Sequence, residues 1–215
     1  METFEMRPIP EEKGRGWVVK IDGVRQMVSS VELSSKFGTL SYGLRPEGYD
    51  AWVFRETGGG GVVTLPYAHT PEGRLLVGVL LEKRANMGDE PVWCAIGGFV
   101  EPDEMHQRVQ AREAGEEAGL DAAKATELPG MATNANRAFF VADASAGEGM
   151  HAYGLSLPFE WLKADGESYK LKDATMLSGF KKASDVQFFQ WRETIRVTAD
   201  AMARSAIAQL LAIVL

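Results

Sequence analysis

The sequence contains a single cysteine, Cys94, and only three histidines. An intramolecular disulfide is therefore excluded, and one chain cannot build a thiolate metal cluster. Any bound metal ion has to be held by oxygen atoms or by the histidines. We expect His69 and His151 in turns or loops and His106 on the surface of a helix, and no spacing joins the three into a metal site. Cys94 is expected to be a small core residue.

Long apolar runs and an excess of basic residues are also absent. The longest apolar stretch, 207–215, is interrupted by Gln209 and has about half the length that a membrane-spanning helix needs. Residues 1–16 carry acidic residues and prolines where a secretory signal would have a basic start and an apolar core. With 23 Lys plus Arg against 30 Asp plus Glu, the net charge is -7, which does not indicate a nucleic-acid-binding surface. These features predict a cytoplasmic protein without a membrane or nucleic-acid partner.

The composition, with 45% hydrophobic and 25% charged residues, is that of a globular chain. Two β-prone runs, 17–21 and 24–28, flank Asp22-Gly23, a pair suited to a tight hairpin turn. The four glycines at 58–61 are costly to order, so we expect a linker or strand bend there rather than a phosphate-binding loop. The glycine run separates an N-terminal β-rich segment, residues 1–57, from a second domain, residues 58–215.

The second domain alternates β-prone segments with helical ones. Apolar residues recur at three- and four-residue spacing between Glu104 and Ala118, as on a helix with one covered side. Another helix is expected over 198–212 and a loop over 145–155. This alternation predicts an α/β fold with a mixed sheet covered by helices. The expected strands are 62–67, 75–82, 92–96, 139–142 and 186–191.

The first of these helices carries an unusual group of acidic residues. Glu113, Glu116 and Glu117 stand at i, i+3 and i+4, so their carboxylates project from one face and repel one another. A hard cation such as Mg²⁺ or Mn²⁺ would offset that repulsion, because it prefers oxygen ligands. Arg112 lies four residues before Glu116 and could hold that carboxylate in place. The alternative from the residues alone is a solvated acidic helix face.

The segment Gly98–Leu120 resembles the Nudix box. That pattern is Gly, five residues, Glu, seven residues, Arg-Glu, an aliphatic residue, any residue, Glu-Glu, any residue, Gly and an aliphatic residue. Every specified position agrees with the pattern, except that Ala114 is small for the aliphatic position. The residues at the specified places are Gly98, Glu104, Arg112, Glu113, Ala114, Glu116, Glu117, Gly119 and Leu120.

The resemblance implies a hydrolase that cleaves the pyrophosphate linkage of a nucleoside diphosphate joined to another group, using Mg²⁺ or Mn²⁺. It also implies the Nudix fold, an α/β/α sandwich with a mixed β-sheet, here with a small N-terminal β-rich appendage. By the same resemblance Glu113 and Glu117 are the principal metal ligands, assisted by Glu116 and the Gly97 carbonyl. Arg112 and Glu104 are supporting partners, and Gly98 and Gly119 are structural.

In several branches of the family a general base is expected outside the helix, often a Glu in a loop downstream. Glu148 is the positional candidate for the base. Glu101, inside the box loop, is a second candidate, for the base or for a metal ligand, and either residue could be solvated. Arg84 stands where ADP-sugar pyrophosphatases place a phosphate-binding arginine, or it is an exposed strand-end residue. The N-terminal appendage resembles the one through which that group forms homodimers. The stretch Cys94-Ala95-Ile96-Gly97-Gly98 departs from the Glu-x-Pro-Ala-Gly common there.

The sequence therefore favours a metal-dependent Nudix hydrolase acting on an ADP-sugar-like substrate. A nucleoside triphosphate or dinucleotide pyrophosphatase is the alternative within enzymes, and a non-catalytic nucleotide-binding module the alternative outside them. Three clustered carboxylates speak against the module, because recognition alone does not need them. Five aromatic rings are candidates for stacking on a base or for the core: Trp17, Trp52, Trp93, Tyr67 and Phe139.

Overall fold

The computed structural model divides the chain into two compact units, Met1–Thr57 with Val141–Gly147, and Gly58–Phe140 with Glu148–Leu215. Strand backbones are described in the first unit, and side chains as well in the second. The described residues are 4–8, 17–21, 24–28, 31–35, 38–44, 50–56, 60–83, 90–101, 103–129, 150–172 and 186–215.

The described strands of the first unit form two three-stranded antiparallel sheets, with orders β1-β2-β3 and β4-β5-β6. In the first sheet Ile21 pairs with Val24, so strands β2 and β3 form the expected hairpin. The strands are β1 (Phe4–Pro8), β2 (Trp17–Ile21), β3 (Val24–Val28), β4 (Val31–Ser35), β5 (Gly38–Leu44) and β6 (Asp50–Glu56).

The described strands of the second unit belong to one nine-stranded sheet of order β11-β12-β7-β8-β15-β14-β13, with β10 paired to β7 and β9 paired to β8. Strands β7 and β12 are parallel, whereas β7 and β8 are antiparallel. The expected mixed sheet is therefore confirmed. The strands are β7 (Gly61–His69), β8 (Leu75–Glu82), β9 (Val92–Cys94), β10 (Ile96–Phe99), β11 (Thr126–Glu127), β12 (Met150–Ser156), β13 (Leu162–Asp165), β14 (Ser168–Leu171) and β15 (Val186–Gln190).

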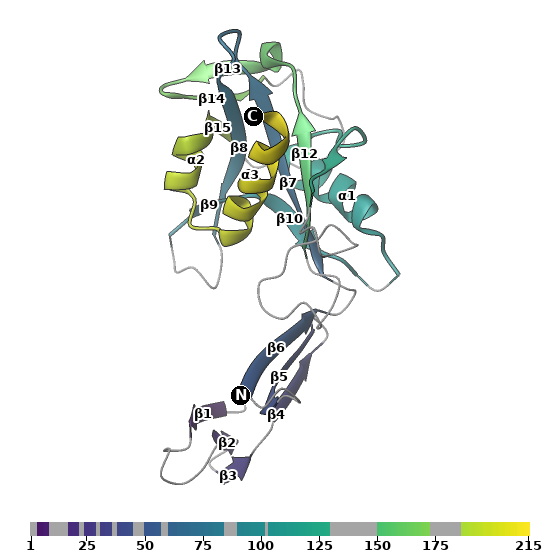
Figure 1. Cartoon of the computed structure of the whole chain (residues 1–215), viewed down its shortest axis with the longest axis vertical. Helices are drawn as coiled ribbons and strands as arrows, with labels where there is room; N and C mark the ends of the chain where they lie inside the picture. The colour runs from purple at the N-terminus through teal and green to yellow at the C-terminus, as the bar shows by residue number, and fades with distance from the viewer. Residues whose placement is uncertain are drawn as a thin grey trace. The chain divides into compact units, whose positions relative to one another are not determined.

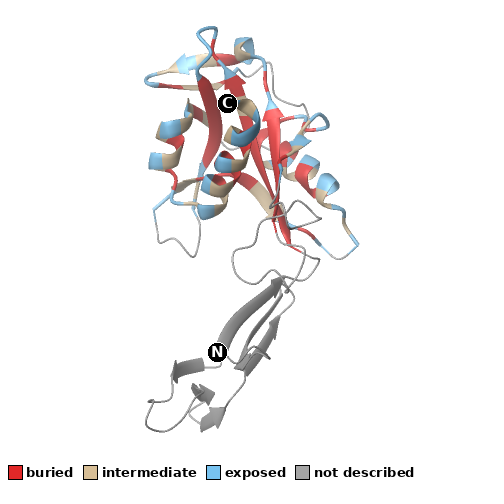
Figure 2. Ribbon diagram, viewed as in Figure 1, coloured by how far each residue is buried: buried red, intermediate tan, exposed pale blue. Residues whose placement is uncertain are grey.

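Helices cover both faces of this sheet, because its central strands carry apolar residues on both sides (Figures 1 and 2). In β7, Val62 packs with Val109 of helix α1 (His106–Ala118). Its neighbour Val63 packs with Ile207 of helix α3 (Ala201–Val214). Successive strand residues point to opposite faces. The result is the expected α/β/α sandwich.

The remaining helices are short. A 3-10 turn, η3 (Phe159–Trp161), precedes β13, and helix α2 (Trp191–Val197) follows β15 directly. Helix α2 begins at Trp191, where we expected the end of a strand. Among the described residues, none of the helices combines the length and apolar character needed to cross a bilayer.

The expected loop over 145–155 is wrong from residue 150 onward, where strand β12 begins. His151 is accordingly buried in a strand and not in a loop, with its Nδ1 2.8 Å from Oε1 of Glu127. His106 was expected on the surface, and the centroid of its ring lies 3.9 Å from that of the His151 ring. The strand expected over 139–142 lies outside the described residues.

Candidate active site

The position of helix α1 is fixed by its buried apolar side and by its C-terminal end at Gly119. Val109, Ala114 and Ala118 are fully buried against the sheet, at four- and five-residue spacing. The helix ends at Gly119, whose φ of 62° is left-handed and suits glycine. The Gly119 N–H donates to the Gly115 carbonyl, and the Leu120 N–H to that of Ala114. This register turns the acidic residues of α1 toward β10.

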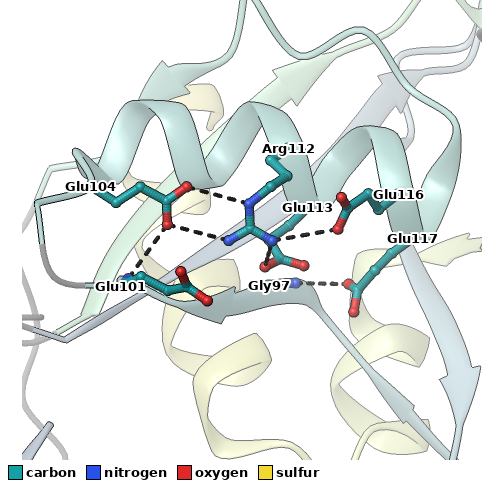
Figure 3. Close-up of polar contacts among 7 residues, drawn as sticks. All are labelled: Gly97, Glu101, Glu104, Arg112, Glu113, Glu116 and Glu117. Carbon is teal, nitrogen blue, oxygen red and sulfur yellow. Dashed lines mark hydrogen bonds and ion pairs between the residues drawn. The ribbon is translucent and has the colours of Figure 1, made fainter. Parts of the chain in front are cut away.

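Arg112 is the centre of a carboxylate network on this helix (Figure 3). Its Nη1 donates to Oε1 of Glu113 at 2.7 Å and to Oε2 of Glu116 at 3.4 Å. Its Nε and Nη2 donate to the two carboxylate oxygens of Glu104, each at 3.4 Å. The Glu101 N–H in turn donates to Glu104. One planar guanidinium thus holds three carboxylates.

Two of the carboxylates meet the glycine pair of β10. Oε2 of Glu117 accepts a hydrogen bond from the Gly97 N–H at 3.0 Å. Glu113 packs directly against Gly98, where an added Cβ would lie only 2.6 Å from the Glu113 Cδ. A side chain at Gly98 would therefore occupy the place of the Glu113 carboxylate. In an extended strand the N–H and C=O of one residue point to the same side, so the Gly97 carbonyl faces the side on which Glu117 lies.

The charged groups of the network lie in different surroundings, and their pKa values are shifted in different directions. Burial raises the pKa of Glu113, and the opposing effect of Arg112 does not fully cancel it. The hydrogen bond from Arg112 lowers the pKa of Glu104, which is partly buried. Burial acts to lower the pKa of Arg112, but its bond to Glu104 and the charge of Glu113 outweigh that effect and raise it. A further positive charge would therefore stabilise the ionised form of Glu113.

The donor set fits a hard divalent cation in chemistry, since every candidate ligand atom is a carboxylate or carbonyl oxygen. Among the residues that the structure describes, no three His, Cys, Asp or Glu side chains are already grouped as a metal site requires. The carboxylates are engaged by Arg112 and by the Gly97 N–H instead. Cation binding therefore needs side-chain rotation within the network.

Most of the residues predicted for the site come together here. Arg84 and Glu148 are the exceptions, because both lie outside the described residues, as does the aromatic candidate Phe139. Glu101 is exposed and contacts the network through its backbone, since its N–H donates to the Glu104 carboxylate and its carbonyl accepts from the Glu104 N–H. The predicted residues that the structure brings together are Gly97, Gly98, Glu104, Arg112, Glu113, Glu116 and Glu117.

A cavity of about 200 Å³ lies beside the same glycine pair. Sequence reasoning missed two of its wall residues, Phe99 and Asp200. Phe99 follows Gly98 at a place that the box pattern leaves open, so the pattern does not single it out. Asp200 is far from the box in sequence, so no local signal connects the two. The lining residues are Val62, Val63, Cys94, Ala95, Gly97, Gly98, Phe99, Met150, Asp200 and Met202.

Comparison with protein families gives one match, in which residues 62–161 fit the model described as the NUDIX domain. This part of the chain is a NUDIX domain. The match runs from β7 through β12 and η3 and includes the acidic helix and the glycine pair, and the box lies entirely within it. The expected family, the expected fold and the expected class of enzyme, a hydrolase of nucleotide pyrophosphates, are therefore confirmed.

Solved structures similar to this chain differ from it strongly in sequence. An ADP compounds hydrolase is 11% identical, with 98% of this chain and 92% of that chain covered and a TM-score of 0.49. An Ap4A hydrolase from C. elegans is 13% identical over 73% and 98%, with a TM-score of 0.45. The NUDIX domain of Shewanella oneidensis NrtR, complexed with ADP ribose, is 15% identical over 78% and 92%, with a TM-score of 0.42. No curated protein matches.

Proposed function

We propose that the NUDIX domain hydrolyses the pyrophosphate bond of a nucleoside diphosphate linked to another group, an ADP-sugar being the favoured substrate, with Mg²⁺ or Mn²⁺. The observation that carries the proposal is the meeting of α1 with β10. Glu117 accepts from the Gly97 N–H, and Glu113 fills the space that a side chain at Gly98 would need. Two carboxylates and a backbone carbonyl are thereby directed to one edge of the sheet.

Glu113, Glu117, Glu116 and the Gly97 carbonyl are the residues that would hold the ions. Bound divalent ions neutralise the negative charge of a pyrophosphate, polarise its oxygens and lower the pKa of a bound water. A protein with a net charge of -7 and an acidic site repels such a substrate, so ions are needed for binding as well as for catalysis. Glu116, with 53% of its side chain exposed, is the ligand nearest to solvent.

Further roles are assigned to residues around the ligands. Arg112, itself held by Glu104, positions Glu113 and Glu116. We assign Glu148 as the general base that takes a proton from the attacking water, with Glu101 as the alternative, and Arg84 as a phosphate-binding residue. The homodimer and the cytoplasmic location expected from the sequence stay predictions.

The proposal is tested with a panel of ADP-sugars, nucleoside triphosphates and dinucleotides, by measuring both products of each reaction. We expect an ADP-sugar to give AMP and a sugar phosphate only with Mg²⁺ or Mn²⁺, and a chelator to stop the reaction reversibly. Preferred cleavage of a triphosphate or dinucleotide would replace the ADP-sugar assignment. No hydrolysis of any member with either metal would point to a binding module instead.

Metal binding is measurable without turnover. A ligand at a hundredfold its Kd stabilises a folded protein by about 2.7 kcal/mol. We therefore expect Mn²⁺ to raise the Tm of the wild type, and to raise that of Glu113→Gln much less. Glu167→Gln serves as the matched control, because Glu167 is exposed in the turn between β13 and β14. An equal rise in all three proteins would remove Glu113 from the ligand set.

Arg112→Lys tests the positioning role. A lysine ammonium is a point charge and cannot replace the fork that reaches Glu104, Glu113 and Glu116 together. We expect kcat to fall about tenfold to a hundredfold, a higher metal concentration at half-activation, and a KM for substrate within about twofold of the wild type. Arg108→Lys, an exposed change on the same helix, should leave all three values unchanged. An unchanged metal requirement in Arg112→Lys would contradict the role.

A further inference from the structure

Two histidines stack between helix α1 and the sheet. Val62 of β7 packs with Val109 of α1 and with Tyr153 of β12, so these elements share one layer. His151 pairs with Val62 in the parallel register of the two strands, two residues before Tyr153. Strand residues two apart point to the same face, so His151 faces α1. His106, the first residue of that helix, lies against it, with the ring centroids 3.9 Å and the ring planes 30° apart.

One carboxylate faces this histidine pair in the part of the chain that the structure describes. It belongs to Glu127 of β11, whose Oε1 lies 2.8 Å from Nδ1 of His151. Tyr153 is the other titratable neighbour, and burial together with the charge of Glu127 raises its pKa to about 12. That phenol therefore stays neutral near pH 7. The remaining polar residues of this layer, Thr64 of β7 and Gln110 of α1, are buried and uncharged.

A second positive charge on the pair is unfavourable. Histidine ordinarily changes its charge between about pH 5 and 8, and Glu127 can balance one imidazolium. Two would repel each other across 3.9 Å in a layer that is largely shielded from water. Charged His151 would also bury an Nε2–H donor, and its Nε2 has no hydrogen-bond partner among the described residues. Charged His106 would stand in the first turn of a helix, where the helix dipole disfavours a cation.

The start of α1 lacks the capping contacts that ordinarily fix a helix N-terminus. Within the described residues, Met105 makes no side-chain cap and the first turn holds no acidic residue. Glu104 lies just before this turn and is bound by Arg112, which in turn holds Glu113. A displacement of the first turn would therefore be passed on to a proposed metal ligand.

We propose that His106 and His151 are positioning residues, which hold the start of α1 on the sheet while at least one imidazole is neutral and release it when both are protonated. Acid then loosens the helix that carries Glu113 and Glu117, whereas α3 keeps its place on the other face of the sheet. The consequence for metal binding rests on the proposed function. The docking of α1 does not.

Hydrogen exchange of the full, metal-free chain measures this docking locally, by mass spectrometry of its peptides. Protection is the exchange time relative to that of an unstructured peptide at the same pH. We expect the protection of residues 109–118 to fall about tenfold between about pH 7.5 and pH 5.5, as one coupled proton allows. The protection of residues 201–214 is the internal control and should change by less than about twofold.

Substitutions show whether the histidines cause the fall. His106→Phe keeps a flat ring against His151 but takes up no proton, so its α1 protection should change by less than about twofold between the two pH values. His69→Phe is the matched control, because His69 is exposed at the far end of β7, and it should keep the wild-type fall. Glu127→Gln keeps an acceptor for Nδ1 but loses the balancing charge, so the fall should be complete by about pH 6.5. A merely structural role would lower protection equally at each pH.

The acidic residues of the site cannot produce the same pattern in the metal-free chain. Burial raises the pKa of Glu113, so its proton is bound more readily in the folded state and stabilises that state as the pH falls. The hydrogen bond from Arg112 lowers the pKa of Glu104, whose contribution is lost only at more acidic pH than the tested range. Equal falls in the wild type and His106→Phe would overturn the proposal. So would a wild type whose α1 protection does not depend on pH.

Turnover separates this inference from the proposed function. Metal ions bind the fraction of molecules in which α1 is docked, so the half-activating Mg²⁺ concentration should rise about twofold or more further in the wild type than in His106→Phe between the two pH values. An equal rise in both would overturn the positioning role. The expected exchange pattern without hydrolysis of any nucleotide would refute the hydrolase and leave the docking pair standing. Hydrolysis with exchange that ignores the histidines would refute only the pair.

Discussion

We expect Glu117→Gln to lower kcat by about a thousandfold or more while leaving the fold intact. Metal-assisted stabilisation of a phosphoryl transition state contributes several kcal/mol, and about 4 kcal/mol corresponds to a factor of a thousand. The amide oxygen of glutamine can still accept from the Gly97 N–H, which Glu117 accepts at 3.0 Å. Only the charge and its ability to bind a cation are lost. The measurement is kcat with saturating Mg²⁺, together with the Tm of the metal-free protein.

The control for this variant is again Glu167→Gln, which removes the same charge from an exposed turn. It should keep the kcat of the wild type. A Glu117→Gln protein with more than a tenth of wild-type kcat would exclude Glu117 as a principal ligand. A Tm lowered by many degrees would instead show that the charge itself supports the fold, and Glu113→Gln would then be the cleaner test of the ligand set.

Gly97→Ala should have the largest effect on stability, a loss of about 3 kcal/mol in the free energy of unfolding. An added Cβ would be driven into the Val62 carbonyl and would lie 3.2 Å from its carbon. That carbonyl belongs to the backbone of the central strand β7, so it cannot rotate away, and the β10–β7 pairing has to shift. Overpacking of this kind costs about 1–3 kcal/mol and occasionally more. Urea unfolding measures the loss directly.

Gly98→Ala is the matched comparison, because the neighbouring glycine differs in what its Cβ would meet. There the obstacle is the side chain of Glu113, whose Cδ would be 2.6 Å away. A side chain can turn aside, so we expect a smaller loss of stability, about 1 kcal/mol. The Glu113 carboxylate, a proposed metal ligand, would then be displaced, so kcat should fall while the fold remains. Equal stability losses in the two variants would contradict this account of the glycine pair.

Local sequence patterns predicted the parts of this protein that are defined by neighbouring residues. The three- and four-residue spacing around Val109 and Ala114 gave the acidic helix, and Asp22-Gly23 gave the hairpin between β2 and β3. The box spacing placed Arg112 next to the carboxylates that it holds. In each case the interacting residues lie within a few turns or one strand of each other, so their geometry follows from standard backbone dimensions.

Features that depend on distant partners could not be predicted in this way. Strand β12 was mistaken for a loop because the segment contains small residues and glycines, including Gly154. The structure gives the reason for Gly154, since a Cβ there would come within 3.1–3.3 Å of Leu128, Tyr67 and Leu210. The partner of β12 is β7, almost ninety positions earlier. No local pattern shows that a small residue is needed between layers that meet only in the folded chain.

The contact of Asp200 with Ala95 is another such feature, since it joins residues 105 positions apart. The helix was expected to start at residue 198, whereas it starts at Ala201 with Asp200 as its cap. The cavity that this contact helps to form was therefore invisible in the sequence. Phe99 was likewise absent from the expected stacking rings, because its exposure is set by the open edge of β10 and not by its neighbours.

The double attachment of Asp200 limits how this enzyme could be redesigned. The residue anchors the C-terminal helix to the sheet through Ala95 and caps that helix through Met202. A substitution of Asp200 would therefore weaken both the cap of α3 and its docking on the sheet. A substitution of Phe99 carries no such penalty, because its exposed side chain lines the cavity, whereas Met202 packs against the core between α3 and the sheet. Libraries that vary Phe99 and keep the aspartate should yield more folded variants than libraries that vary the aspartate.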